Sequence, residues 1–145
     1  MFFGTYRHNL DDKNRLVVPS KFRNILGSSS LYIMQGYEGA LEVYKQETFA
    51  ALVSRIEKLA YNDPNARNFI RTRLSSVVEV EVDNSGRISL PVSLVNRYNI
   101  TKDVVVIGVN DHFEIWSASK WDPYIEEVGS DLENIAARLG NYDDH

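Results

Sequence analysis

The segment Asp11-Asp12-Lys13-Asn14-Arg15-Leu16-Val17-Val18-Pro19 has a second version later in the chain, Asp83-Asn84-Ser85-Gly86-Arg87-Ile88-Ser89-Leu90-Pro91. Both read D-x-x-x-R, followed by an apolar residue, any residue, an apolar residue and proline. The offset of 72 positions (83 minus 11) continues without a gap, so that Leu41-Glu42-Val43-Tyr44 matches Phe113-Glu114-Ile115-Trp116. An offset held over this length indicates an internal repeat, and the chain is therefore predicted to contain two copies of one unit.

Each copy is predicted to contain a strand, a turn, a short strand, a short helix, a hairpin and a longer helix. Residues Ser76–Val82 alternate valine with polar side chains, which is typical of a half-buried strand. The first copy is assigned to residues 1–75 and the second to residues 76–145. The other expected elements are short strands over Leu16–Val18 and Ile88–Leu90, short helices over Pro19–Leu26 and Pro91–Tyr98, hairpins of Leu31–Gln35 with Leu41–Tyr44 and of Val104–Val109 with His112–Trp116, and helices over Gln46–Ala60, over Pro64–Ser75 and from Ser119 onward.

The D-x-x-x-R segments are predicted to be turns of one backbone shape. Aspartate at the start of a turn can accept hydrogen bonds from backbone amides two residues on, and Gly86 supplies a positive φ. The first copy has Asn14 where the second has Gly86, and asparagine is one of the few other residues that tolerate the left-handed region. We therefore interpret Asp11, Asp83 and Gly86 as turn organisers.

The charge of the chain is unevenly distributed. The 145 residues carry 16 Lys and Arg against 20 Asp and Glu, a net charge of −4, which by itself argues against nucleic-acid binding. Residues 1–27 nevertheless hold five basic residues against two acidic ones, and residues 55–75 have the same balance, whereas residues 110–145 hold nine acidic residues against two basic ones. Such segments are often no more than solvated faces, but they also fit a basic recognition surface far from an acidic helix.

Several classes of function are not supported by the sequence. The chain has no cysteine, so disulfide scaffolds, thiol catalysis and thiolate zinc sites are excluded. His8, His112 and His145 are scattered, phosphate-binding loop motifs are missing, and adjacent acids diverge rather than converge on a substrate. We expect no enzyme activity, metal, cofactor or small-molecule substrate. Apolar runs fall short of the roughly 20 residues of a membrane span, and the start does not resemble a signal peptide, so a cytoplasmic protein without a membrane partner is expected.

Arg15 and Arg87 are the main candidates for binding. An arginine leaving a rigid turn presents a planar fork that suits phosphate oxygens or the O6/N7 edge of guanine. A single D-x-x-x-R pair would more commonly be a surface ion pair worth less than about 1 kcal/mol, but two pairs at matched positions favour function. The further candidates are Arg7, His8, Asn9, Lys13 and Asn14 for DNA contact, which make the first copy richer in donors, and Lys21 and Arg23 for phosphate contact or solvation.

Two helical surfaces remain open to more than one interpretation. Arg67, Arg71 and Arg73 are expected on the outside of their helix, where they extend a phosphate track or pair with a neighbour's acidic helix. The C-terminal helix shows a heptad seam, which packs on its own domain or against a neighbouring subunit. Its members are Trp121, Ile125, Val128, Leu132, Ile135 and Leu139, and the terminal residues Asn141–His145 are expected to be frayed.

The stretch from Gly4 to Arg23 and the later D-N-S-G-R-I-S-L-P together resemble the MraZ family of bacterial transcriptional regulators. Related AbrB-type domains carry one such half per chain and pair by swapping hairpins. The resemblance implies an α+β fold, mainly β with helices, built as an AbrB-like double-split β-barrel from two swapped halves. Asn14 in place of glycine is the one visible departure from the pattern.

The resemblance also implies a function and partners. It implies a nucleoid-associated repressor that binds tandem short direct repeats in double-stranded DNA upstream of its own gene, within the division and cell-wall gene cluster. The D-x-x-x-R turns would make the contact, and the subunits would form a ring of about eight copies. The alternative is a ring-forming protein-interaction module whose nucleic-acid binding is incidental.

Overall fold

The computed structural model describes residues 1–140, so the expected fraying of Asn141–His145 lies outside the described part. The strands are β1 (Thr5–Asn9), β2 (Arg15–Val17), β3 (Leu31–Gln35), β4 (Leu41–Lys45), β5 (Val78–Val80), β6 (Arg87–Ser89), β7 (Asp103–Gly108) and β8 (Phe113–Ser117). The helices are α1 (Ser20–Leu26), α2 (Gln46–Glu57), α3 (Pro64–Ser75), α4 (Val92–Arg97), α5 (Ala118–Gly129) and α6 (Leu132–Arg138). The predicted α+β class is confirmed.

The two copies exchange their first strands. Six strands form an antiparallel sheet in the order β1-β7-β8-β4-β3-β5, while β2 and β6 pair with each other in a separate two-stranded sheet. Strand β1 of the first copy thus lies beside β7 of the second, and β5 of the second lies beside β3 of the first. The six-stranded sheet is open, with β1 and β5 at its edges, so closure into a double-split barrel stays a prediction, as does the boundary between residues 75 and 76.

The main core lies on one face of the six-stranded sheet. Alternation along the strands places side chains such as Val43 and Ile115 on the face toward the small sheet and the short helices, where Leu16, Ile88 and Phe22 are fully buried. Fully burying an aliphatic or phenyl side chain stabilises a fold by about 1.5–3 kcal/mol, so this shared cluster holds the small sheet firmly against the large one.

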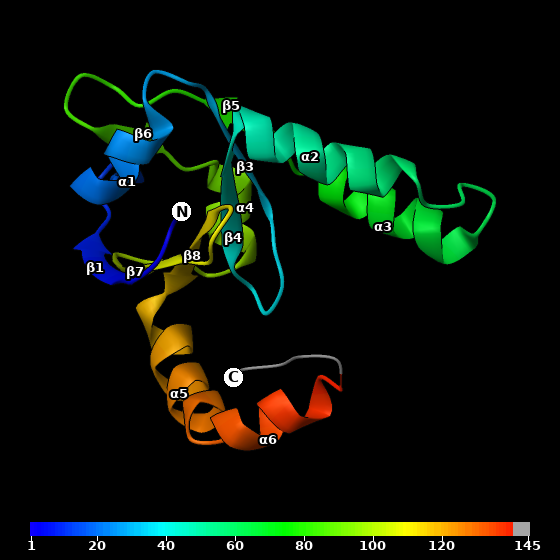
Figure 1. Ribbon diagram of the computed structural model, residues 1–145. Coiled ribbons are helices and arrows are strands. Elements are labelled where there is room, and N and C mark those ends of the chain that lie inside the picture. Colours follow the sequence, from blue (N-terminus) through cyan, green and yellow to red (C-terminus); the bar gives the residue numbers. More distant parts are fainter. Residues whose placement is uncertain (141–145) are drawn as a thin grey trace.

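Two helical arms pack against the opposite face of the sheet and project away from it (Figure 1). The hairpin of α2 and α3 packs on β3 and β4, and its contacts include a stacked pair of Tyr32 and Phe49 with ring centroids 4.3 Å apart. Helix α5 packs on β7 and β8 through Trp121, which meets Trp116 edge-on at 5.1 Å. Among residues 1–140, none of the helices has the length and apolar character needed to cross a bilayer.

The predicted continuous C-terminal helix is wrong, because it is interrupted between α5 and α6. Gly129, Ser130 and Asp131 are weak helix formers, and the Ser130 hydroxyl donates to the Glu127 carbonyl at the break. The heptad seam is therefore divided between two helices. The predicted strand Ser76–Val82 is confined to Val78–Val80, and at its start the Ser76 hydroxyl donates to the Arg73 carbonyl at the end of α3.

Candidate nucleic-acid interface

The first D-x-x-x-R turn is organised by the Asp11 carboxylate. One oxygen, Oδ1, accepts the backbone amides of Lys13 and Arg15 at 2.9 and 2.8 Å. The other, Oδ2, accepts Nε of Arg15 at 2.6 Å. The arginine is therefore held by its Nε edge, and within the described residues its terminal amino groups donate to no other side chain or carbonyl.

The second turn repeats this arrangement. Asp83 Oδ1 accepts the amides of Ser85 and Arg87, both at 2.9 Å, and Oδ2 accepts Nε of Arg87 at 3.0 Å. Asn14 has a φ of 57° and Gly86 a φ of 77°, so the prediction that both turns share a left-handed residue is confirmed.

Pairing of β2 with β6 brings the two turns into one surface. Leu16 pairs with Ile88, and the amides of Val18 and Leu90 donate reciprocally to the carbonyls of Gly86 and Asn14 at 2.9 and 3.0 Å. The repeat offset converts one of these bonds into the other, because Leu90 corresponds to Val18 and Gly86 to Asn14, so a pseudo-twofold axis passes through the small sheet.

The axis places the two arginines diagonally across the ladder, on the face opposite the buried Leu16 and Ile88. Their side chains are 28% and 30% exposed, and Nη1 of Arg87 lies 3.8 Å from Asp11 Oδ2. Arg15 and Arg87 lie 72 positions apart in the sequence, and their guanidinium groups thus belong to a single platform.

Hydrogen bonding keeps both organising carboxylates ionised. The backbone amide of Arg15 is the largest cause that lowers the pKa of Asp11, and the backbone amide of Arg87 does the same for the pKa of Asp83. An ionised carboxylate accepts only, so it fixes the Nε side of each guanidinium and leaves the Nη side for a ligand.

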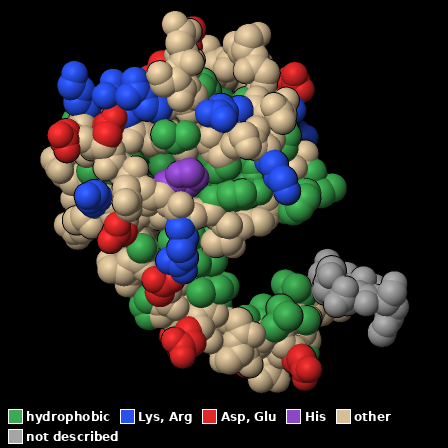
Figure 2. Space-filling view, turned by 90° about the vertical axis from the view of Figure 1, so that its left-hand side faces the viewer, with side chains coloured by type: hydrophobic (Ala, Val, Ile, Leu, Met, Phe, Trp, Pro, Cys, Tyr) green, Lys and Arg blue, Asp and Glu red, His purple; other side chains and the backbone are tan. Residues whose placement is uncertain are grey.

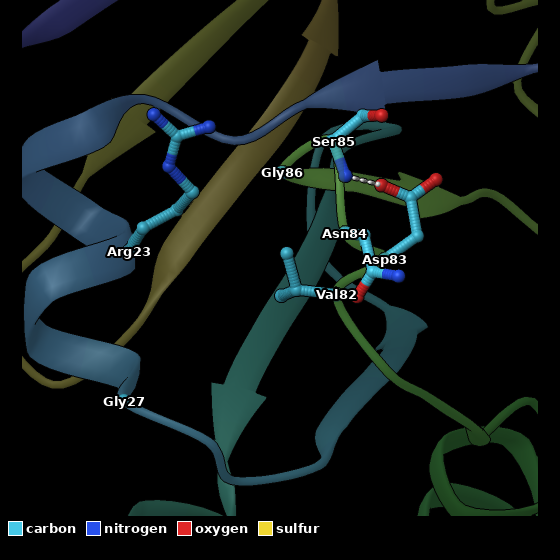
Figure 3. A pocket seen from close by; sticks show the side chains of 7 residues that line it. All are labelled: Arg23, Gly27, Val82, Asp83, Asn84, Ser85 and Gly86. Carbon is cyan, nitrogen blue, oxygen red and sulfur yellow. Dashed lines mark hydrogen bonds between the residues drawn. The ribbon is translucent and has the colours of Figure 1, made fainter.

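Arg23 lies over the second turn (Figure 3). A Cβ placed on Gly86 would meet Arg23 Nη1 at 1.8 Å, so the missing side chain of glycine makes room for the guanidinium. Arg23 from α1 and residues 82–86 of the turn line an open hollow of about 470 Å³. The repeat-related position is Val95, so the first turn has no such arginine. This contact between α1 and the turn has no local sequence signal.

The remaining predicted residues are distributed around this platform. Lys13 and Asn14 lie in the first turn, and Lys21 is exposed on α1. Arg7, His8 and Asn9 lie instead on β1, around a hollow shared with Asp103 of β7 and Asp122 of α5. Arg7 donates two hydrogen bonds to the Asp122 carboxylate, and burial lowers the pKa of His8. Their proposed role in DNA contact stays a prediction.

Arg73 corrects the expectation of an outward-facing basic helix. It is 6% exposed, donates Nη1 to the Gln35 carbonyl at 2.8 Å and donates Nη2 to Glu42 Oε1 at 2.9 Å. It therefore neither extends a phosphate track nor pairs with a neighbour. The partner, Glu42, occupies an inward position on β4 that only the three-dimensional structure reveals.

Charge is segregated on the surface. Figure 2 views the side that carries β1 and α1, and Lys and Arg side chains gather on its upper part with a few acidic groups beside them. The lower projection, formed by α5 and α6, carries acidic and apolar side chains. The sequence-level segregation of charge is thus also a segregation in space.

One cluster was not predicted from the sequence. Glu42, His112 and Glu114 each offer a ligand atom within 4.8 Å of the others. The histidine has no metal-ligand spacing in the sequence, and the only signal was that Glu42 and Glu114 occupy matching repeat positions.

Comparison with known proteins gives consistent matches over the chain. The family model MraZ, described as "MraZ protein, putative antitoxin-like", matches residues 1–72 and again 74–141. A protein named Transcriptional regulator MraZ from Ligilactobacillus salivarius is 39% identical over 99% of both chains. A protein of the same name from Natranaerobius thermophilus is 41% identical over 99% of both chains. Another, from Mesoplasma florum, is 40% identical over 96% of this chain and 95% of its own. A chain that carries both D-x-x-x-R turns, and that matches the family model over nearly all of its length, belongs to the MraZ family.

Proposed function

We propose that this protein is a transcriptional regulator that binds specific double-stranded DNA through its two D-x-x-x-R turns. The observation that carries the proposal is the pairing of β2 with β6, which joins Arg15 and Arg87 in one platform with their Nε edges already bound by Asp11 and Asp83. The names of the relatives support the regulatory role.

Each guanidinium is held ready for a ligand. Fixing a long side chain in the free protein reduces the ordering cost of binding. The Nη groups of Arg15 and Arg87 donate no hydrogen bond within the described residues, and they can then meet a guanine edge or two phosphate oxygens. Arg23 adds a third positive charge beside the second turn, suited to a backbone phosphate.

A surface built on so few arginines is expected to bind one short DNA site weakly. We propose that several subunits, in a ring of about eight, engage tandem repeats together, because linked weak sites gain affinity without new contacts. Direct repeats spaced by one helical turn, about 10 base pairs, would present the same groove to successive subunits. The proposed target is the DNA upstream of the protein's own gene in the division and cell-wall cluster, where an occupied promoter is repressed in the nucleoid.

The test is binding to the upstream DNA, compared with a scrambled fragment of equal length, at 50 and 200 mM salt. Three phosphate contacts predict a loss of about 40-fold in affinity over this range. The Arg23→Ala variant should reduce the slope of log affinity against log salt concentration by about 1, the value of one phosphate contact. Equal affinity for both fragments, or binding that does not depend on salt, would contradict the proposal. Affinity for one isolated repeat equal to that for the tandem array would contradict the avidity step.

A second candidate is a ring-forming interaction module whose DNA binding is incidental. It is favoured by the exposed apolar residues of the C-terminal arm, since Ile125, Leu132 and Leu139 are 40%, 67% and 54% exposed. If this candidate is correct, Arg15→Ala weakens DNA binding but leaves the biological effect of the protein unchanged.

A further inference from the structure

Two glutamates face each other at the centre of the six-stranded sheet. Glu42 on β4 pairs directly with Glu114 on β8, and the two occupy the same position in their copies. Each accepts a hydrogen bond from the aromatic residue two positions on, the Tyr44 hydroxyl at 3.0 Å and the Trp116 indole at 2.9 Å. Like charges directly opposite each other on a sheet are destabilising, so this pair needs compensation.

The available compensation is incomplete. Arg73 neutralises Glu42 through Oε1, whereas the Oε2 of Glu42 accepts no hydrogen bond from the described residues. Glu114 has the Trp116 indole but no ion pair with another described residue, and burial raises the pKa of its carboxyl group. The pair therefore favours an additional positive charge, which a proton or a cation can supply.

His112 supplies a nitrogen ligand at the same place. Its Nδ1 lies 2.7 Å from Asp111 Oδ1, and its ring stacks on Tyr44 with centroids 4.4 Å apart. The carboxylate next to Nδ1 favours the tautomer with the proton on that atom, which leaves a lone pair on Nε2. Nε2 is buried and has no hydrogen-bond partner among residues 1–140. A carboxylate behind an imidazole is the usual outer-shell arrangement of a metal-binding histidine.

We propose that Glu42, His112 and Glu114 bind one divalent zinc ion. Their ligand atoms lie within 4.8 Å of one another, whereas ligands about 2.1 Å from zinc are about 3.4 Å apart in a tetrahedron. A contraction of at most about 1.4 Å, by side-chain torsions, closes the site. An imidazole with two carboxylates suits zinc better than Mg²⁺ or Ca²⁺, which prefer six or more oxygens. The ion would neutralise the glutamate pair and give Nε2 its missing partner.

The site is shared between the copies and does not depend on DNA binding. Glu42 comes from the first copy, and His112 and Glu114 come from the second, so a bound ion joins the two hairpins across the β4–β8 seam. Arg73 connects the same cluster to α3. We therefore assign the ion a structural role, holding the two copies together at the centre of the sheet.

The test uses the full chain, treated with a chelator and then titrated with zinc chloride or magnesium chloride. The proposal predicts one zinc ion per chain, an increase of about 5–10 °C in Tm at saturating zinc, and no change with magnesium. Glu114→Gln, which keeps an acceptor for the Trp116 indole, and His112→Asn should each lower zinc affinity at least about tenfold. The matched controls His8→Asn and His145→Asn remove the other two histidines and should bind zinc as the wild type does.

X-ray absorption of the zinc-loaded wild type keeps the test decisive if a variant fails to fold. Imidazole and carboxylate ligands at about 2.0–2.2 Å support the site. The proposed zinc site would be overturned by a shell of water oxygens only, by the absence of a zinc-dependent change in Tm, or by an equal loss of zinc affinity in the control variants. A proton on Glu114 would then be what compensates the like charges of the glutamate pair.

Discussion

Asp83 illustrates how one side chain fixes a recognition turn. Its Oδ1 accepts two backbone amides and its Oδ2 accepts Arg87 Nε, and Asp11 does the same in the first copy. Ordering both the turn and the arginine through one carboxylate explains why the motif needs aspartate and why a spacing of four residues recurs.

Asp83→Asn is expected to destabilise the protein at neutral pH. Asparagine keeps one oxygen for the amides, but its NH₂ group opposes the Nε donor of Arg87. The lowered pKa of Asp83 means that its contribution to stability is present above the ordinary carboxyl value of 3.8 and is lost as the pH falls through the still lower folded-state value. Urea denaturation at several pH values tests this, and a wild-type advantage that stays constant from pH 7 to pH 3 would contradict it.

Gly86 is restricted both by its backbone and by its neighbour. Gly86→Ala places a Cβ at a φ of 77° and 1.8 Å from Arg23 Nη1. Gly140→Ala is the matched control, because Gly140 has a φ of 69° with nothing within 4 Å and follows α6, on the arm away from the turns. A left-handed conformation costs an alanine about 1–2 kcal/mol, so both variants should lose this stability, and only Gly86→Ala should also weaken DNA binding by displacing Arg23. Equal DNA affinity of the two variants in fluorescence anisotropy would argue against a role for Arg23.

At the scale of elements, α3 is attached to the sheet by a buried ion pair. Arg73→Met leaves Glu42 without its cation, and breaking such a pair typically costs about 3–5 kcal/mol. The control Arg71→Met, on an exposed position of the same helix, should cost less than about 0.5 kcal/mol. Chemical denaturation compares the two, and similar stabilities would show that the pair contributes little.

The elements that the sequence predicted well are those specified by local chemistry. The turn at Asp83–Gly86, the hairpin at residues 36–39 and helix α3, which begins at Pro64 as expected, depend on a few neighbouring residues. The exchange of β1 and β5 between the copies is non-local pairing, which alternation alone cannot assign. Likewise, the burial of Arg73 depends on a partner 31 positions away.

In the candidate site, too, features set by neighbouring residues were predictable, whereas those set by non-local contacts were not. Arg15 and Arg87 were predicted because the repeat places them at matched positions, and the turn shape was predicted because asparagine and glycine share the left-handed region. That the two turns form one platform follows from the β2–β6 ladder, and that Arg23 belongs to the second turn follows from the packing of α1. Neither contact has a sequence signal, since each joins segments more than 60 positions apart.

At the scale of the whole molecule, a net charge of −4 is compatible with DNA binding. In the view of Figure 2, Lys and Arg side chains gather on the upper part of the surface together with acidic ones, whereas the lower end of the arm formed by α5 and α6 carries acidic and apolar side chains. Local potential, and not the total, steers a charged ligand to its site. In the proposed ring, the exposed apolar residues of the same arm would serve for subunit association and leave the arginine platform free.

Anisotropy titrations of the upstream DNA with Arg15→Ala, Arg87→Ala and Arg55→Ala test whether Arg15 and Arg87 form one DNA-binding surface. Arg55 is exposed on α2, so its variant removes the same charge away from the turns. Loss of a bidentate arginine contact is worth about 1–3 kcal/mol, so each turn variant should bind at least about fivefold more weakly, while Arg55→Ala should bind within about twofold of the wild type. If the turn variants and Arg55→Ala bind equally well, the two turns are not the DNA-binding surface.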